Sequence, residues 1–175
     1  MKLTTLIMIA ALSAVSAVAG AAGEKITAAE FVKKAGAAGV AEVEMGKLGA
    51  TKATNAQVKA FAQKMVTDHT KANQELLAYA AANKLEVPAS PDLVHKAMAE
   101  KFEHQSSDAD FNHDFMQQMV RDHKDAVELF QAAATEPSLD VDLRTFANKT
   151  LPTLKQHLAT AEKLEAKLAK AKAKS

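Results

Sequence analysis

The sequence contains no cysteine and no tryptophan, and it has only four prolines, six glycines and one tyrosine. The absence of cysteine excludes disulfide bonds, thiolate metal ligands, a cysteine nucleophile and a lipid-anchored cysteine, so packing alone must stabilise the fold. Few prolines and glycines leave long uninterrupted stretches, and the abundant alanine, leucine, lysine and glutamate favour helices over strands. We therefore expect an all-α protein.

The chain has little net charge, formally +1 at neutral pH. This balance gives no basis for nucleic-acid binding by the whole domain. A local exception is a lysine-rich end, formed by Lys163, Lys167, Lys170, Lys172 and Lys174. We expect these lysines to be a solvated helix terminus, with contact to anionic lipid or cell wall as the alternative.

Residues 1–22 have the pattern of a secretory signal peptide. Lys2 supplies a positive start, residues 3–18 are apolar or small, and Ala17-Val18-Ala19 offers a cleavage site, with cleavage expected near Gly20 or Ala22. An uncleaved membrane anchor is the alternative, but the run is short for a spanning helix of about 20 residues. We expect one domain over residues 23–175, either periplasmic or secreted.

Capping residues and prolines divide this domain into four long helices and one short one. The expected helices cover residues 27–52, 56–83, 92–104, 109–135 and 141–170. Because residues 84–108 form a long connection, the third long helix can start at the far end of the molecule. Two helical hairpins joined by a long crossover that contains a short helix are the topology of ferritin-like four-helix bundles.

The first long helix carries glycines at Gly36, Gly39, Gly46 and Gly49. A glycine inside a helix costs about 1 kcal/mol relative to alanine. Several of them therefore predict that a neighbouring backbone packs closely against this helix.

An Asp-His motif occurs twice, as Met65-Val66-Thr67-Asp68-His69 and as Met119-Val120-Arg121-Asp122-His123. Both copies lie in helix-patterned sequence, so each places an imidazole and a carboxylate at the same depth of a helix. Each long helix contributes at least one polar residue to the expected interior. The full set is Glu42, Asp68, His69, Asp122, His123 and His157.

Four-helix bundles build metal sites from carboxylates and imidazoles that project toward a shared axis. These ligand types suit zinc or iron and do not choose between them. Asp68 cannot face its neighbour His69, so its carboxylate would have to reach a histidine on another helix. By axial rise, His157 lies about 9 Å beyond the level of His123 unless Pro152 changes the register. Two layers, or a hydrogen-bonding role for His157, therefore remain open.

The alternative interpretation is that these residues make interhelical hydrogen bonds that fix how the helices pair. Three further histidines, His95, His104 and His113, lie near the crossover. We expect them at the surface, with Glu100/His104 and Asp110/His113 as exposed helical pairs.

Four segments resemble an exported bacterial family catalogued as domain of unknown function 4142. They are AEVEMGKL at 41–48, VKAFAQKMVTDHTKAN at 58–73, VRDH at 120–123 and LPTLKQHL at 151–158, and the resemblance covers about residues 28–168. This resemblance implies a ferritin-like bundle, and the same six polar residues match the polar motif of the family. It implies no biochemical activity, because none is established for the family. The family usually shows Phe-Asp-Arg-x-Tyr where this chain has Phe111-Asn112-His113-Asp114-Phe115. The Glu-x-x-His pairs of ferritins are missing too, which disfavours a di-iron oxidase.

The sequence thus predicts an exported ferritin-like helical bundle that binds a divalent metal, zinc or iron, through the interior His/Asp/Glu set. The alternative is a non-catalytic envelope or stress-related interaction module in which that set is purely structural.

Overall fold

The computed structural model describes residues 25–174, which form five α-helices and no strand. The helices are α1 (Ala28–Lys52), α2 (Ala56–Ala82), α3 (Leu93–His104), α4 (Ala109–Thr135) and α5 (Val141–Lys172). This confirms the all-α prediction. None of these helices has an apolar stretch long enough to cross a membrane. The expected signal peptide and its cleavage site lie outside the described residues.

A polar capping residue precedes each of the five helices, and the sequence predicted this for α1, α2 and α5. Thr27 and Glu30 form a capping box, in which each side chain accepts a hydrogen bond from the backbone N–H of the other. At the other four helices one side-chain oxygen accepts from the first turn. The residues are Asn55, Asp92, Asp108 and Asp140. These bonds satisfy backbone donors that have no partner within the helix, so they set where each helix begins.

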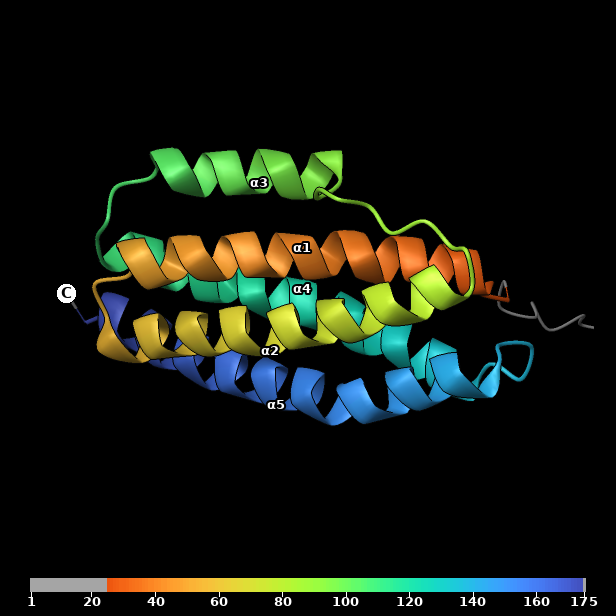
Figure 1. The fold of residues 1–175 in the computed structure, drawn as a ribbon. Helices are drawn as coiled ribbons and strands as arrows, with labels where there is room; N and C mark the ends of the chain where they lie inside the picture. Colours follow the sequence, from red (N-terminus) through yellow and green to blue (C-terminus); the bar gives the residue numbers. More distant parts are fainter. Residues whose placement is uncertain (1–24, 175) are drawn as a thin grey trace, which may run out of the picture.

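The four long helices lie side by side as two antiparallel pairs (Figure 1). α1 packs along α2 and α4 packs along α5, with further contacts of α2 with α5 and of α1 with α4. The connection that contains α3 crosses the length of the molecule along α1, so α4 begins at the end where α2 also begins (Figure 1). The helices α2 and α4, which carry the two Asp-His motifs, therefore run parallel to each other.

Lys52, at the end of α1, fixes the C-terminus of α3. Its Nζ donates to the carbonyl oxygens of Phe102 at 2.9 Å, Glu103 at 2.5 Å and Gln105 at 2.5 Å. A cation is favourable there because the last carbonyls of a helix carry partial negative charge and lack helical partners. Phe102 itself is buried in the core, so α3 is attached through both a polar and an apolar contact.

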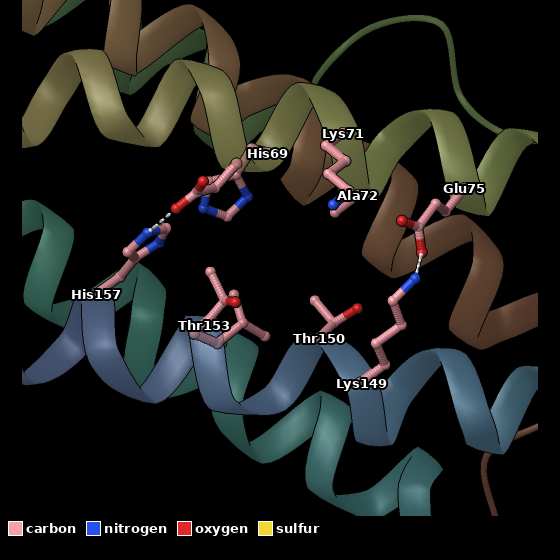
Figure 2. Close-up of a pocket in the computed structure, with 10 residues that line it drawn as sticks. His69, Lys71, Ala72, Glu75, Lys149, Thr150, Thr153 and His157 are labelled. Carbon is pink, nitrogen blue, oxygen red and sulfur yellow. Dashed lines mark hydrogen bonds and ion pairs between the residues drawn. The ribbon is translucent and has the colours of Figure 1, made fainter.

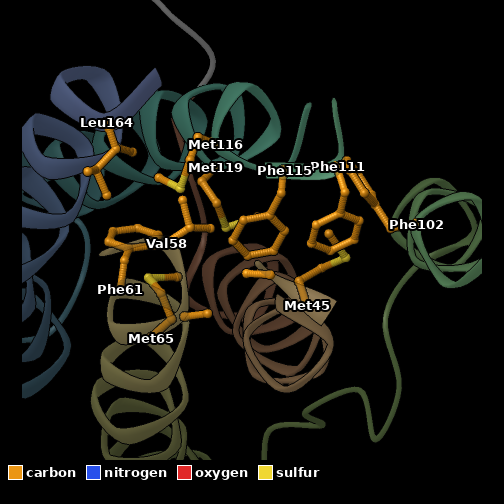
Figure 3. Close-up of a cluster of buried hydrophobic side chains, with 13 residues drawn as sticks. Met45, Val58, Phe61, Met65, Phe102, Phe111, Phe115, Met116, Met119 and Leu164 are labelled. Atoms are coloured by element: carbon orange, nitrogen blue, oxygen red, sulfur yellow. The ribbon is translucent and has the colours of Figure 1, made fainter. Parts of the chain in front are cut away.

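The hydrophobic core consists of two clusters along the helix axes. One surrounds Phe61, Met65, Phe115 and Met119, together with Phe102 from α3 (Figure 3). The other contains, among others, Phe31, Val32, Leu76, Phe130, Leu143, Phe146 and Leu154. In α2 the first cluster ends at Met65 and the second begins at Leu76, which leaves a layer between them for polar side chains.

The glycines of α1 allow close contact with its neighbours, as predicted. A Cβ atom at Gly46 would lie 3.1 Å from the carbonyl oxygen of Ala62 and 3.2 Å from the backbone nitrogen of Val66, both in α2. At Gly49 it would lie 2.5 Å from the ring of Phe115 in α4. Because the atoms near Gly46 include backbone, they cannot move aside as a flexible side chain would.

We predict that Gly46→Ala lowers the free energy of unfolding by about 1–3 kcal/mol, the usual cost of overpacking, although alanine favours a helix. Urea denaturation of purified protein measures this difference. The matched control is Lys47→Ala, an exposed change in the same helix turn that we expect to alter stability by less than about 0.5 kcal/mol. Equal stabilities of the two variants would contradict the close approach of α1 and α2.

Candidate metal centre

Three histidines from three helices meet in the polar layer between the two hydrophobic clusters. His69 of α2, His123 of α4 and His157 of α5 are 7%, 0% and 1% exposed. Their ring centroids are 5.6 Å (His69 to His123), 5.5 Å (His69 to His157) and 5.4 Å (His123 to His157) apart. The rings thus form a nearly equilateral triangle, which we call the histidine triad.

The triad can offer one nitrogen from each ring to a common point. These nitrogens lie within 4.8 Å of one another. Tetrahedral zinc, with Zn–N bonds of about 2.0–2.1 Å, separates its nitrogen ligands by about 3.4 Å. An inward movement of roughly 1 Å would therefore bring all three nitrogens to bonding distance. The residues fit a single metal ion.

The structure corrects the axial estimate for His157, which lies beside His123 and not in a separate layer. The estimate compared Cα levels, whereas side chains in a helix lean toward its N-terminus. Since α4 and α5 are antiparallel, the two imidazoles lean toward each other along the axis. The opposite tilt of the two side chains accounts for the short distance between the rings. No break of the helix at Pro152 is needed, because α5 continues as one helix through this residue.

Asp68 orients His157. The Nε2 atom of His157 lies 2.8 Å from Oδ2 of Asp68, and the same carboxylate accepts a hydrogen bond from Lys64 at 2.7 Å. This confirms that Asp68 serves a histidine on another helix. A ring that donates Nε2–H to a carboxylate keeps its lone pair on Nδ1, and Nδ1 of His157 is buried without a hydrogen-bond partner in the described part of the chain.

His123 is oriented by its own helix. Its Nδ1 lies 2.9 Å from the carbonyl oxygen of Met119, so Nδ1–H donates and the lone pair is on Nε2. Nε2 of His123 and Nε2 of His69 are both buried, and neither has a partner within residues 25–174. Each imidazole of the triad therefore has one buried nitrogen to which no described residue makes a hydrogen bond.

All three imidazoles are held in their neutral form. Burial lowers the pKa of His69 to about 3, helped by the nearby rings of His123 and His157. Burial likewise lowers the pKa of His123 to about 4. The pKa of His157 is also lowered by burial, although Asp68 opposes the shift. A metal ion binds the neutral ring, so the site needs no deprotonation at neutral pH.

The other two predicted residues, Glu42 and Asp122, lie beside the triad. Glu42 is 5% exposed. Its Oε1 lies 3.7 Å from Nδ1 of His123, and this distance is too long for a hydrogen bond. Its Oε2 is buried and has no hydrogen-bond partner among the described residues. Burial and the nearby Asp122 raise the pKa of the Glu42 carboxyl well above its usual value. Asp122 is half-buried, accepts a hydrogen bond from Gln118 at 2.8 Å and has a pKa raised by burial.

Two cavities reach the triad. The first, of about 140 Å³, lies between α2 and α5; Figure 2 shows His69 and His157 near one end and the Glu75–Lys149 ion pair near the other. The second, of about 210 Å³, is lined by parts of α1, α2, α4 and α5 and by the start of α3. His69 lines both cavities.

His95 was expected at the surface, and the structure corrects this. It is half-buried, its ring contacts Asp92 at 2.9 Å, and it lines the second cavity together with Asp122. Neither Asp92 nor Asp125, which also line this cavity, was expected at the site. The helix period of α3 indicates which residues share a face, but not which face turns toward the long helices.

The structure also corrects the expected Asp110/His113 pair and shows the role of Asn112. Asp110 forms an ion pair with Lys172 at 2.6 Å and not with His113. His113, expected to be exposed, is half-buried and lies 3.5 Å from Glu165. Asn112, at the position of the family's aspartate, accepts hydrogen bonds from the backbone of Thr54 and Asn55, each at 3.1 Å. At Asn112, the departure from the family pattern thus falls at the turn between α1 and α2, not at the triad.

Residues 13–164 match the model of a protein family described as "Domain of unknown function (DUF4142)". No curated protein and no solved structure matches the chain.

We predict that the metal-free protein loses stability as pH falls below about 6.5. The unfolded chain takes up a proton on His69 near its ordinary pKa of 6.5, whereas the folded state resists until about 3. Stability present above pH 6.5 is therefore lost on acidification, by about 1.4 kcal/mol per pH unit for one such group. Urea denaturation with a chelator should show a loss between pH 7 and pH 5 about 2 kcal/mol larger in wild type than in His69→Gln.

The control for this experiment is His104→Gln, which changes an exposed imidazole. It should lose as much stability on acidification as wild type does. If His69→Gln behaves like this control, burial does not keep the triad neutral.

Proposed function

The chain belongs to the family described as domain of unknown function 4142, and we propose that it binds one divalent transition-metal ion through His69, His123 and His157. Two observations carry this proposal: each of the three imidazoles has a buried ring nitrogen without a hydrogen-bond partner in residues 25–174, and one nitrogen from each ring lies within 4.8 Å of the other two. Buried polar atoms are normally hydrogen-bonded, so three exceptions at one point need an explanation. A bound cation supplies it.

A set of three imidazole ligands favours a transition-metal ion over a hard cation such as magnesium or calcium. Imidazole suits zinc, iron, copper and nickel, whereas magnesium and calcium prefer oxygen ligands. The triad contains no carboxylate, which argues against the carboxylate-rich di-iron centres of ferritins. Zinc and iron remain the ions that we propose. With three protein ligands the ion keeps a further position for water or a small ligand.

Asp68 supports the centre without binding the ion in this proposal. Its hydrogen bond to Nε2 of His157 fixes the tautomer that presents Nδ1 to the triad. A carboxylate partner also makes the imidazole a stronger ligand.

We further propose that the domain is a ferritin-like four-helix bundle, exported to the periplasm or beyond. The two antiparallel pairs and the crossover along the length of the molecule support this topology. The export proposal rests on the signal-like pattern of residues 1–22.

One specific observation favours the structural alternative. The hydrogen bonds of His157 to Asp68 and of His123 to Met119 already satisfy one nitrogen of each ring. In this alternative, the hydrogen-bond network has a purely structural role and fixes the pairing of the helices. The alternative leaves the three remaining nitrogens unexplained.

We predict that the purified mature protein binds about one zinc or ferrous ion per chain and that the His69→Ala/His123→Ala double variant binds none, as measured by elemental analysis after dialysis. At a free ion concentration about 100 times the dissociation constant, binding should add about 2.7 kcal/mol of stability. For a domain of this size, the melting temperature should rise by roughly 5–11 °C.

The matched control is His104→Ala/His113→Ala, which removes two histidines outside the triad and should retain the metal. Equal metal content in wild type and the triad variant would refute the centre. If chelation leaves the melting of wild type unchanged while the triad variant loses about 1–3 kcal/mol for each buried group left unpaired, the network is structural.

A further inference from the structure

The triad is buried so deeply that an ion needs a path to it. The exposed fractions of the three histidines range from 0% to 7%, and His69, the most exposed, lines both cavities. Each cavity is therefore a candidate route. Their charges differ, and this difference distinguishes them.

The cavity between α2 and α5 is electrically balanced. Its acidic residues are Asp68 and Glu75, and its basic residues are Lys71 and Lys149. Both carboxylates already have a lysine partner, Lys64 for Asp68 at 2.7 Å and Lys149 for Glu75 at 2.9 Å. Nothing in this opening attracts a cation in preference to an anion.

The second cavity is acidic. Among its lining residues four are acids, Glu42, Asp92, Asp122 and Asp125, and one, Lys34, is basic. A cleft in which charges of one sign predominate concentrates ions of the opposite sign and can raise their association rate by roughly 10- to 1,000-fold. We call this cavity, with its four acids and His95, the acidic vestibule.

The acids of the vestibule are graded in depth. Asp92 and Asp125 are exposed, Asp122 is half-buried, and Glu42 is 5% exposed. Glu42 is the innermost, because its Oε1 lies 3.7 Å from the ring of His123. Its Oε2 is buried and has no hydrogen-bond partner in residues 25–174. A buried carboxylate oxygen without a donor is the type of ligand that a passing cation can use.

We propose that the acidic vestibule is the entry route of the metal ion, and that Glu42 is a transient ligand that passes the ion from the vestibule to the histidine triad. This proposal rests on the metal centre proposed above. It assigns Glu42 and Asp122 to delivery of the ion, whereas the triad holds it. His95, which lines the same cavity, is placed to contribute an imidazole ligand on the way.

The test uses the full mature chain without metal and Co²⁺ as the probe, followed by stopped-flow absorbance. In Asp122→Asn/Asp125→Asn the second-order rate constant of loading should fall by about tenfold at low ionic strength. In about 0.5 M salt the difference should shrink, because salt screens exposed charges. Glu42→Gln should also slow loading, and this effect should persist in salt because the group is buried.

The matched control is Glu75→Gln, which removes one acid from the opposite opening and should load at the wild-type rate. The amount of Co²⁺ bound at saturation, measured on the same samples, separates slow loading from loss of the centre. If wild type binds Co²⁺ but the vestibule variants load as fast as it does, or if Glu75→Gln is slowed instead, the route is refuted and the centre stands. If wild type binds no Co²⁺, the centre is refuted and the route with it.

Discussion

The arrangement of this protein depends on neutral imidazoles buried in a layer between two hydrophobic clusters. Burial in such a layer lowers the pKa of His69 to about 3 and that of His123 to about 4, because a charged ring would lose its hydration. A neutral imidazole has one donor and one acceptor nitrogen. Asp68 and the carbonyl of Met119 satisfy the donors of His157 and His123, and the acceptors are left facing the protein interior.

The backbone brings these rings together through simple helix geometry. Side chains of antiparallel neighbours lean in opposite directions along the axis, and for His123 and His157 these directions converge, so the two rings meet although their Cα atoms lie at different levels. The glycines of α1 add a second condition, because they let α1 lie against the backbone of α2 near Ala62. Close packing of α1 also places Glu42 within 3.7 Å of His123. The site therefore depends on small residues as much as on the polar ones.

Local signals in the sequence were sufficient to predict the helices and part of the site. Capping residues such as Thr27 and Asp140 act on their own first turn, so the sequence alone locates the starts of the helices. The helix period predicted that His69 and His123 face inward, and the rule that helix neighbours diverge predicted that Asp68 reaches another helix. The level of His157 could not be predicted from Cα rise alone. The position of His95 could not be predicted either, because α3 is attached by Lys52 and Phe102, contacts between residues far apart in the sequence.

The two Asp-His motifs occupy related positions, and yet their aspartates have different surroundings. Asp68 of α2 meets an imidazole of α5, and the pair forms a hydrogen bond of 2.8 Å that orients His157. Asp122 of α4 lies near a carboxylate of α1, Glu42, and burial, together with this nearby like charge, raises the pKa of the Glu42 carboxyl. The partner helix thus decides the role of each copy. The copy that meets histidine positions a ring of the proposed metal centre. The copy that meets glutamate lines the acidic vestibule, so the repeated motif is structurally asymmetric, and this asymmetry is the basis of the proposed direction of ion entry.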